Sequence, residues 1–528
     1  MKFKTNFLAI FLFFFINILI YPQIAPKSFY LGSAKKMAKT SADATPNSNS
    51  ITDIVTLGDT VWLGTGAGVS LTTNGGTSWT NFTGTPAFGT EDVSALSYDK
   101  YNKVIWVATA HDENTSSGNV ATGSGLKYTT DNGNTWTSIS QPVDTDADTV
   151  IVYGKNNLKA LPVTVPQENV IYDIAFTPGA VWIATWAGGL RKSTDMGKSW
   201  QRVVLPPDNL NSISTTDTLD FCYSPISGKI CNTGNLNLEG FSVVAVDSLT
   251  LYVGTAGGLN KSTDGGVSWT KFTHLNQANP ISGNWVVALA YDYFYNTIWA
   301  ATRSAEGSTE FFAVSYSTDG GQNWQTTLPN QTVWNFGINR NEVIAVADDG
   351  AYKTIDYGAN WFLPGIITDA NSGISLRTNT FYAAAFQDDN IWLGSSEGLA
   401  KLSGNTSAWN GTWKVFFASK SLSSSGDTYA YPNPFNPNTD ILKIKYSTNG
   451  SSVPVTIRIF DFGMHFVRTV IQNATRGNPV HVVDSSSGTI DYWDGKDEHG
   501  NTVPNGVYFY RVDPGSQKPV YGKVIVLH

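Results

Sequence analysis

The sequence has 528 residues, a formal net charge of −8 and only 14% charged residues, with 49 glycines and 17 tryptophans. This acidic balance argues against nucleic acid as a partner, because phosphates attract basic surfaces. Abundant Gly, Thr, Ser, Asn and Trp with few charges is typical of an exported protein built from short strands and tight turns. The chain has two cysteines and no CxxC or Cys/His cluster, which argues against a structural zinc site.

Residues 1–23 have the pattern of a secretory signal peptide. Lys2 and Lys4 precede an apolar run from Phe7 to Ile20, which is too short for a membrane-spanning helix. Removing this segment takes away two lysines and no acid, so the net charge moves from −8 to −10. No other stretch is apolar enough to span a membrane, so we expect no transmembrane segment in the mature chain. Residues 24–50, rich in Ser, Ala, Lys and Asn, are predicted to be a loosely ordered lead-in.

A four-strand unit repeats from Ile51 onward. Its second strand is the clearest marker, because most copies have an aromatic residue near the middle and end on a hydroxyl-bearing residue. The copies are residues 61–65, 105–109, 181–185, 251–255, 298–302, 343–347 and 391–395. Four short strands per unit at this spacing are typical of radially repeated sheets. The sequence therefore predicts an all-β fold with a seven-bladed β-propeller over residues 51–418.

A turn motif recurs between the third and fourth strands of the units, and Ser262–Trp269 is its clearest copy. The Asp264 carboxylate can accept hydrogen bonds from the turn amides, Gly266 can adopt a positive φ, and Trp269 closes over the turn. We call these segments the Asp turns and assign their acids or amides a structural role. These residues are Asn74, Asp131, Asp195, Asp264, Asp319 and Asp356. A seventh copy, 403–413, keeps the Trp and lacks the Asp.

Cys222 and Cys231 flank a segment with a turn signal at its centre. In an oxidising compartment this spacing predicts a disulfide that closes a hairpin. The alternative is two unpaired thiols in an inserted loop.

Loop lengths distinguish the two faces of the predicted propeller. The Asp turns lie on one face, called here the turn face. The corners after the second strands and the links between units lie on the other, the link face. From the second-strand aromatic to the turn Trp takes 17 residues in the first and fourth units, 30 in the second and 25 in the fifth. The links at 137–170 and 203–240 are also long, so we expect the ligand-binding surface on the link face.

Aromatic and polar residues are predicted to gather on the link face. Trp186, Trp285 and Trp334 are not explained by the repeat, and exposed rings there would stack on a sugar or grip a peptide. The alternative is that they fill the central channel or pack under the inserted loops. The polar candidates at the same corners are His111, Asp112, Glu113, Arg303, Glu306, Asp348, Asp349 and Glu397.

Two of these carboxylates could serve a glycoside hydrolase, which needs a pair about 5 to 10 Å apart with one pKa raised. We assign no catalytic residue, because corner carboxylates are more often solvated turn residues. Asp144, Asp146 and Asp148 alternate as calcium ligands do, but their loop lacks the Gly and Glu of an EF-hand. We therefore expect no metal or other cofactor, with calcium at this loop as the alternative.

The repeat ends after Phe417. Residues 419–428 form a Ser-rich linker, and residues 429–528 hold alternating strands that predict a small β-sandwich. This segment has Tyr-Pro-Asn-Pro-Phe-Asn-Pro at 431–437 and ends with strands at 506–511 and 522–527.

The Asp turns resemble the Asp-box, or BNR, repeats of sialidases, xyloglucanase-like glycosidases, sortilin-type receptors and photosystem II assembly-factor propellers. The resemblance covers residues 51–418 and implies a fold rather than a function. The Arg-Ile-Pro motif of sialidases is absent, which puts sialidase activity in doubt.

Residues 429–528 resemble the type A sorting domain of proteins exported by the type IX secretion system, and their Asp-Gly-Lys-Asp stretch is similar to the Ig-like domain of hook-capping proteins. The resemblance implies a small Ig-like β-sandwich, the type IX machinery as a partner, and release from the cell or attachment to its surface.

These observations predict a secreted or cell-surface module that binds a glycan or an extracellular protein without catalysis. The alternative is a glycoside hydrolase acting on an extracellular polysaccharide. A third hypothesis is an assembly protein whose propeller face docks another exported protein.

Overall fold

The structure is a computed structural model that describes residues 42–43, 45–116, 118–370, 375–405, 408–418, 422, 426–438, 440–449, 451–477 and 489–528. The predicted signal peptide, most of the lead-in and much of the linker lie outside these residues. Apart from a short 3-10 turn, η1 (Leu236–Leu238), the regular elements of the described chain are β-strands. None of its helical segments is long and apolar enough to cross a membrane.

The described residues up to 416 form seven antiparallel sheets and a separate β-hairpin, and each of the seven sheets has three or four consecutive strands that run outward from an innermost first strand. The inner strands are β2 (Ile51–Leu57), β6 (Asp92–Asp99), β12 (Ile171–Thr177), β17 (Gly240–Ala245), β21 (Trp285–Asp292), β25 (Val333–Asn339) and β28 (Phe381–Gln387). The second strands are β3 (Thr60–Thr65), β7 (Val104–Thr115), β13 (Ala180–Thr185), β18 (Leu251–Thr255), β22 (Thr297–Arg303), β26 (Glu342–Ala347) and β29 (Asn390–Ser395). These contain or overlap all the predicted second-strand segments.

The outer strands are shorter than the inner ones in most sheets, with β8 (Gly118–Thr129) as the exception. The third strands are β4 (Gly68–Thr72), β8 (Gly118–Thr129), β14 (Gly189–Ser193), β19 (Gly258–Ser262), β23 (Ala313–Ser317), β27 (Gly350–Thr354) and β30 (Leu399–Ser403). The fourth strands are β5 (Trp79–Asn81), β9 (Thr137–Ile139), β15 (Gln201–Arg202), β20 (Trp269–Phe272), β24 (Gln325–Thr327) and β31 (Thr412–Phe416). The sheet of β25, β26 and β27 has only an isolated bridge, Lys353 to Phe362, where a fourth strand was predicted.

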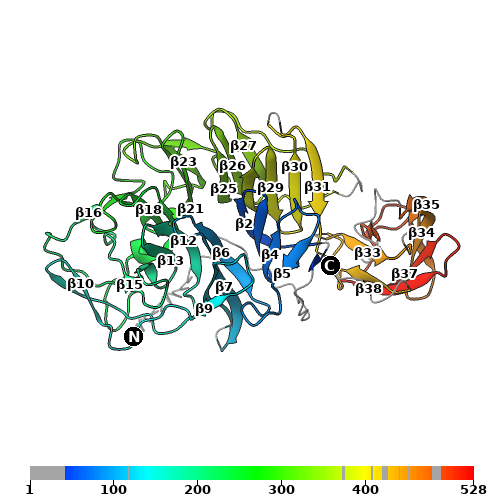
Figure 1. The fold of residues 1–528 in the computed structure, drawn as a ribbon, viewed down its shortest axis with the longest axis horizontal. Helices are drawn as coiled ribbons and strands as arrows, with labels where there is room; N and C mark the ends of the chain where they lie inside the picture. The colour runs from blue at the N-terminus through cyan, green and yellow to red at the C-terminus, as the bar shows by residue number, and fades with distance from the viewer. Residues whose placement is uncertain are drawn as a thin grey trace, which may run out of the picture.

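The inner strands form a closed ring. Each contacts the next in the order β2, β6, β12, β17, β21, β25, β28, and β28 contacts β2. Hydrogen bonds also join the two ends of this part of the chain: the Thr56 hydroxyl donates to the Phe386 carbonyl at 2.7 Å, and the Ala418 amide donates to Asn49 Oδ1 at 2.6 Å. Sheets that radiate from one axis in this way make a β-propeller (Figure 1).

The Asp turns are held by a repeated set of hydrogen bonds. In the turn at Asp264, the Ser262 hydroxyl donates to Asp264 Oδ1 at 2.8 Å and accepts the Gly266 amide at 2.9 Å. The Ser268 amide then donates to Asp264 Oδ1 at 2.9 Å. Equivalent bonds form at the other turns, including the one with Asn74 in place of Asp. These bonds favour the charged carboxylate, and those from Ser199 lower the pKa of Asp195 to about 2.

In each Asp turn, the glycine two residues after the Asp or Asn has a positive φ and packs against an aromatic side chain of the preceding sheet. A Cβ on Gly266 would lie 2.6 Å from Trp182 Cη2. The same position lies within 3.4 Å of a second-strand Trp at Gly76, Gly133, Gly197 and Gly358, and it meets Phe272 at Gly321. The contact of Gly76 is with Trp392 of the last sheet, so this packing also continues around the closed ring.

The long links cover the outer edge of the propeller as well as its link face, which corrects the expectation that every insertion lies on the link face. The 137–170 link contains the hairpin of β10 (Val150–Tyr153) and β11 (Asn156–Lys159), whose Tyr153 hydroxyl donates to Val267 of an Asp turn at 2.7 Å. The 203–240 link adds β16 (Ser212–Ile213) beside β20. Figure 1 shows β10 and β16 at the outer end of the molecule. Within the second link Cys222 and Cys231 form the predicted disulfide.

Part of the predicted lead-in is ordered against the propeller. The strand β1 (Ala42–Asp43) pairs antiparallel with β5 and makes that sheet five-stranded. Asn47 reinforces this edge, because its side-chain amide donates to the Ala67 carbonyl at 2.5 Å.

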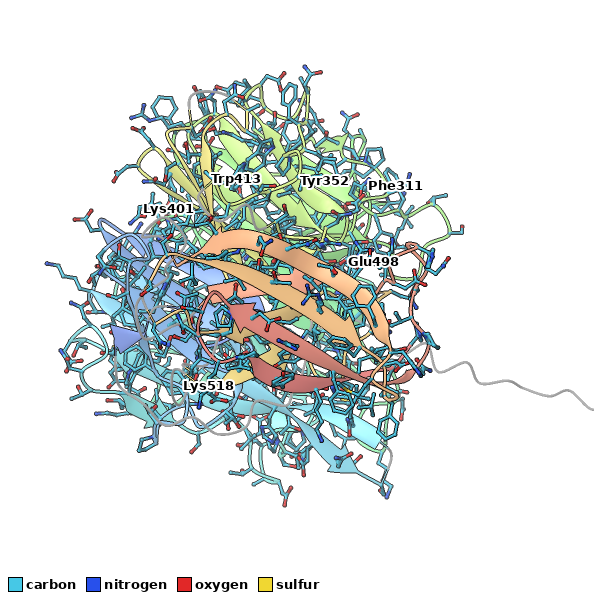
Figure 2. The ribbon with its side chains drawn as sticks, turned by 90° about the vertical axis from the view of Figure 1, so that its right-hand side faces the viewer. Phe311, Tyr352, Lys401, Trp413, Glu498 and Lys518 are labelled. Atoms are coloured by element: carbon cyan, nitrogen blue, oxygen red, sulfur yellow. A yellow bond between two sulfur atoms is a disulfide. The ribbon has the colours of Figure 1, made fainter. Side chains whose placement is uncertain are left out.

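Residues from 428 onward form two further sheets around their own core. One sheet has the order β32 (Thr428–Tyr431), β33 (Leu442–Tyr446), β36 (Thr489–Trp493). The other has the order β35 (Phe466–Arg476), β34 (Val453–Phe460), β37 (Gly506–Pro514), β38 (Val520–Val526). Buried side chains of both sheets, such as Tyr446 and Tyr510, share one cluster, so this part is a β-sandwich. Figures 1 and 2 show it at one end of the propeller.

We expect Gly266→Ala to destabilise the protein more than Gly265→Ala. Both glycines have a positive φ, but a Cβ on Gly265 has no neighbour closer than 3.9 Å, whereas one on Gly266 would overlap Trp182. Both changes carry the backbone cost, and the overlap adds about 1–3 kcal/mol for Gly266→Ala alone. Urea unfolding of both variants measures the difference. Equal losses of stability would show that the Trp contact contributes nothing.

Candidate functional site

Every inner strand of the ring carries one β-bulge at the same place in its pairing with the second strand. The bulged residues are Thr52, Ser94, Tyr172, Phe241, Val287, Trp334 and Tyr382. All of them are buried. Because a bulge re-aims the side chains beside it, these positions and the residues that follow them shape the centre of the propeller.

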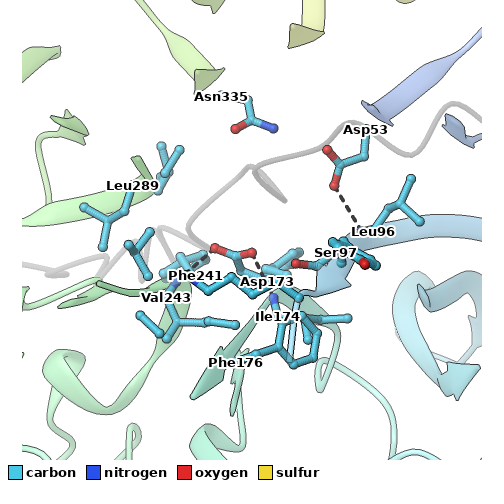
Figure 3. Close-up of a pocket in the computed structure, with 18 of the residues that line it drawn as sticks. Asp53, Leu96, Ser97, Asp173, Ile174, Phe176, Phe241, Val243, Leu289 and Asn335 are labelled. Carbon is cyan, nitrogen blue, oxygen red and sulfur yellow. Dashed lines mark hydrogen bonds between the residues drawn. The ribbon is translucent and has the colours of Figure 1, made fainter. Parts of the chain in front are cut away.

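A cavity of about 290 Å³ lies among the inner strands (Figure 3). Residues directly after the bulges reach its wall, among them Asp53, Asp173 and Asn335. Apolar side chains such as Leu289 and Val243 fill the wall between them. The cavity wall thus combines apolar side chains with fixed polar groups, and its accessible surface is more polar than apolar.

The two cavity carboxylates also tie neighbouring sheets together. Asp53 accepts the amides of Ile54 and Leu96, both at 3.0 Å, and Leu96 belongs to the next inner strand. Asp173 accepts the amide of Ile174 at 2.8 Å and that of Val243, also on the next inner strand, at 2.9 Å. These bonds fix the orientation of both carboxylates (Figure 3).

Buried aromatic rings close the cavity toward the link face. Tyr172 stacks on Phe241 with ring centroids 5.5 Å apart, and Phe241 contacts Trp285 at 5.4 Å. Trp334 packs against Tyr382 at 6.2 Å. All five side chains are at most 7% exposed, so this end is a packed layer.

The opposite end of the cavity opens on the turn face. Its rim includes Lys100 and Tyr101 from the β6–β7 turn and Tyr293 from the β21–β22 turn. Tyr101 is 39% exposed and Tyr293 is 58% exposed. Lys100 Nζ lies 5.3 Å from the centroid of the Tyr101 ring and 5.2 Å from that of Tyr293. The Tyr293 hydroxyl donates to the Ala245 carbonyl at 3.0 Å, which steadies the ring at the mouth.

The expectation of exposed tryptophans on the link face is wrong for Trp285 and Trp334, which are 7% and 6% exposed. They match the alternative, in which the rings fill the central channel. Arg303 lies against both, with its Cζ 5.6 Å from the ring centroid of Trp285 and 4.3 Å from that of Trp334. Neither ring is therefore exposed on the link face, although Trp334 lines the cavity.

Arg303 is itself buried rather than presented to solvent. It is 1% exposed, and burial lowers its pKa to about 10 although Asp348 acts in the other direction. Asp348 accepts the Trp334 indole N–H at 2.7 Å. These three residues therefore support the packed layer that closes the cavity.

Other predicted link-face residues are engaged with close neighbours. His111 Nδ1 lies 2.8 Å from Ser124 Oγ in the β7–β8 hairpin, where paired strands replace the loop predicted for the second unit. Asp349 accepts the Tyr352 hydroxyl at 2.9 Å, and Glu113 accepts the Gln167 amide at 2.7 Å. Glu306 is exposed. The structure does not bring these residues together into one site.

Glu397 belongs to the contact between propeller and sandwich, not to the group of candidate ligand-binding residues. Its Oε1 lies 3.2 Å from Nζ of Lys443 on β33, and its Oε2 accepts the Arg377 and Thr378 amides. Lys443 Nζ also lies 4.5 Å from the Phe417 ring centroid. Burial lowers the pKa of Lys443, and Glu397 acts against that shift.

Two buried carboxyl groups that the sequence analysis did not single out stand on the link-face side. Asp92 and Glu239 occupy equivalent positions, each two residues before a bulged residue. Burial, followed by the charges of Asp112 and Glu91, raises the pKa of Asp92 to about 7, and neither carboxyl oxygen has a hydrogen-bond partner among the described residues.

Glu239 is paired with the remaining predicted tryptophan. Burial raises its pKa to about 7, a hydrogen bond from half-buried Trp186 opposes the shift, and the charges of Asp208, Glu168 and Glu306 add to it. A carboxyl group with this pKa can donate or accept a proton near neutral pH.

In the acidic loop that was considered as a calcium site, residues 144–148, arginine side chains pair with Asp144. Asp144 Oδ1 lies 2.8 Å from Arg191 Nη1, and its Oδ2 lies 3.7 Å from Arg202 Nη1. Asp148 accepts the Thr145 amide at 2.7 Å. Over the described residues, no group of three or more His, Cys, Asp or Glu side chains is arranged to hold a metal ion.

The comparisons with known proteins give no family assignment. No protein-family profile and no curated protein sequence matches the chain. Similar solved structures include PorZ, a surface component of the type IX secretion system of Porphyromonas gingivalis, with 16% identity over 90% of this chain and 65% of that chain and a TM-score of 0.32. An ancestral GH74 enzyme has 15% identity over 92% and 64%, with a TM-score of 0.49. YCF48 from Cyanidioschyzon merolae has 12% identity over 67% and 92%, with a TM-score of 0.36.

This chain spans just under two thirds of the PorZ and GH74 chains. At these low identities and TM-scores the matches assign no function, and the fold is established here by the closed ring of inner strands.

Asp92→Asn should reduce the loss of stability at rising pH. Between about pH 4 and 7 the folded protein keeps the Asp92 proton while the unfolded chain has released it, so stability falls as the pH rises through this window. Asparagine cannot titrate, so the substitution removes this pH-dependent loss of folding free energy, which is on the order of 1–3 kcal/mol by about pH 8. Urea unfolding at about pH 5 and pH 8 measures it, with exposed Asp146→Asn as control. Parallel pH profiles for wild type and Asp92→Asn would contradict the assignment.

Glu397→Gln should loosen the contact between propeller and sandwich. The change leaves Lys443 buried without its charged partner, which costs about 3–5 kcal/mol when one side of a buried ion pair is lost. We expect faster protease cleavage at 419–428 and a larger radius of gyration in solution scattering. Glu306→Gln, at an exposed carboxylate, serves as control, and Glu397→Gln with Lys443→Met should recover part of the docking. Unchanged cleavage in Glu397→Gln would show that the pair does not hold the two parts together.

Proposed function

We propose that the chain is a secreted or cell-surface, non-catalytic module that binds a glycan or an extracellular protein at its axial cavity. One observation carries this proposal: the cavity of about 290 Å³ is closed by packed aromatics at one end and opens between exposed Tyr101 and Tyr293 at the other. Exposed tyrosines on short turns offer rigid contact area at low entropic cost.

The proposal includes a seven-bladed propeller with Asp-box turns and a C-terminal Ig-like domain of the type IX sorting class. The ring order of the inner strands supports the number of blades. In the sandwich, Asn433 Oδ1 accepts the Ile525 amide at 2.9 Å and the Phe435 amide donates to the Ile525 carbonyl at 2.8 Å. The segment at 431–437 thus covers the edge strand β38, a compact arrangement that suits passage as a folded unit.

A glycoside hydrolase is the second candidate, and Glu239 is the observation that favours it. Its pKa of about 7, the hydrogen bond from Trp186 and the nearby charge of Glu306 are what a general acid with a second carboxylate would need. In this alternative Glu239 would protonate the leaving oxygen of the glycosidic bond.

Binding of the full chain to a glycan array and to a panel of extracellular proteins tests the main proposal. We expect capture that falls at least tenfold in Tyr101→Ala and Tyr293→Ala, because each removes one wall of the mouth. Tyr521→Ala is a matched control, since Tyr521 is also 58% exposed but lies on β38 of the sandwich.

Product analysis on any captured glycan separates the two candidates. Intact glycan supports the binding module. Shortened oligosaccharides whose release is lost in Glu239→Gln would replace it with the hydrolase. Capture that is unchanged in both tyrosine variants would exclude the axial cavity as the site.

A further inference from the structure

We infer that the β-sandwich inserts the turn between β34 and β35 into the surface of a lipid bilayer that carries anionic headgroups. This turn and the residues that flank it, 460–466, are called here the sandwich tip. The inference concerns a second surface of the molecule and does not depend on what the axial cavity binds.

Large apolar side chains project from the sandwich tip into solvent. Phe462 is 75% exposed, Met464 is 56% exposed and Phe466 is 50% exposed. The ring of Phe509 on β37 extends this patch, because its centroid lies 6.3 Å from that of Phe462. Exposed apolar patches mark surfaces that meet a membrane or another protein.

The backbone of the tip forms its own hydrogen bonds. The Asp461 amide donates to the His465 carbonyl, and the Met464 amide donates to the Asp461 carbonyl, both at 3.0 Å. The Asp461 carboxylate accepts the His465 amide at 2.8 Å and lies 3.0 Å from His465 Nδ1. Unpaired polar groups are costly in lipid, so a turn closed in this way enters the bilayer interface at a small desolvation cost.

Arginines stand behind the apolar rings of the tip on the same sheet. Phe460 lies opposite Phe509 in the register of β34 and β37. Two residues further from the tip, Arg458 lies opposite Arg511. Side chains two residues apart share a face of the sheet and are separated by about 7 Å. Because interfacial elements bury their apolar side chains about 5–10 Å deep, insertion of the rings places the arginines among the lipid phosphates.

The charges of this sheet face favour an anionic surface. Arg458 and Arg511 share the carboxylate of Asp513, at 3.6 and 2.6 Å. Exposed Lys523 on β38 lies opposite Phe509. The three cations therefore exceed the carboxylate that pairs with them, and each basic side chain near an anionic bilayer strengthens binding.

The charge of the whole molecule acts in the same direction. Residues 429–528 contain nine basic and eight acidic residues, whereas residues 24–428 contain 23 basic and 34 acidic ones. An anionic surface thus repels the propeller and attracts the sandwich, which turns the sandwich toward it. Figure 1 shows β34 and β35 at the opposite end of the molecule from β10 and β16, so the sandwich can meet a surface while the acidic propeller stays clear of it.

Acidic side chains beside the tip are held by hydrogen-bond donors. Glu498 lies next to the tip, since its amide donates to the Val467 carbonyl at 3.0 Å, and its Oε1 accepts the Thr469 amide at 2.9 Å. Asp497 accepts the His499 amide at 2.8 Å. These donors offset part of the repulsion between the acids and anionic headgroups.

A bilayer fits the tip better than a rigid protein partner. Side chains that are 50–75% exposed on one turn would each need a matching pocket in a protein. A bilayer interface deforms around the turn and needs no matched shape. The observations therefore favour lipid, and a protein partner is an outcome that the experiment can reveal.

Flotation of the full chain with protein-free vesicles tests the inference. The vesicles contain phosphatidylglycerol mixed with phosphatidylcholine, or phosphatidylcholine alone. We expect binding to both, with the mixed vesicles bound roughly tenfold more tightly at low salt and this preference lost at high salt.

Variants of exposed residues separate the apolar contribution from the charge contribution. Phe462→Ser and Met464→Asn should each weaken binding to both vesicles by about tenfold. Asparagine suits the φ of +62° at Met464. Leu275→Ser, at an 82% exposed position of the propeller, is the matched control and should change nothing. Arg458→Gln with Arg511→Gln should remove most of the preference for phosphatidylglycerol and leave binding to phosphatidylcholine.

A fluorescent label reports insertion directly. The native cysteines are joined in a disulfide, so Phe462→Cys supplies a thiol for an environment-sensitive dye. Its emission should shift to the blue when vesicles are added, while the same dye at Leu275→Cys should not respond.

The outcomes distinguish lipid from protein and keep this inference apart from the proposed function. Absence of vesicle binding by the wild type, or unchanged binding in both folded tip variants, would overturn lipid insertion. Binding to native membrane fragments but not to vesicles of their extracted lipids, lost in Phe462→Ser, would assign the tip to a membrane protein instead. If circular dichroism shows that Phe462→Ser is unfolded, Met464→Asn decides. Capture of a ligand at the axial cavity should be the same in every tip variant, so either result stands without the other.

Discussion

The packing of a turn glycine against an aromatic ring of the preceding sheet is the constraint on which the rest of the structure depends. Gly266 has a φ of +86°, and a Cβ there would lie 2.6 Å from Trp182. The positive φ closes the Asp turn, and the missing Cβ lets the turn approach the neighbouring sheet. Because the same contact joins Gly76 of the first sheet to Trp392 of the last, a local turn rule also sets how adjacent sheets pack around the ring.

Because the turn glycines and aromatic rings set the packing between sheets, the side chains of the inner strands can differ from one sheet to the next. Their bulges occur at one common position, but the bulged residue ranges from Ser94 to Trp334. Large aromatics at several of these positions pack together and close one end of the axis, while Asp53 and Asp173 just beyond them hold adjacent strands by accepting their amides. The shape and polarity of the cavity thus depend on which side chains the inner strands carry, while the backbone of these strands is the same in each sheet. For this reason the fold by itself does not determine the ligand.

The sequence was sufficient for the propeller but not for its site. The second strands, the Asp turns and the Cys222–Cys231 disulfide were predictable because each depends on residues close together in the chain. The burial of Trp285 and Trp334 was not predictable. An aromatic residue at the start of an inner strand gives the same sequence pattern whether its ring faces solvent or packs against Arg303. Glu397 was misplaced because its partner, Lys443, lies 46 residues away. A usable signal for the cavity was the polar residue inside an otherwise apolar inner strand, as in Thr52-Asp53-Ile54 and Tyr172-Asp173-Ile174.

The two faces of the propeller consequently differ in chemistry rather than only in loop length. The turn face has short connections, yet it exposes tyrosines around an open cavity. The link face has long connections, but its Trp285 and Trp334 are buried and its acids Asp92 and Glu239 are held with raised pKa values at equivalent positions. Burying two such groups lowers stability at neutral pH, and nothing in the ring requires it, because Val170 takes the same position directly before a third inner strand, β12. Long loops alone are therefore a poor guide to which face leaves the axis accessible, since here the inserted residues cover sheet edges and buried groups while the shortest turns leave the axis open.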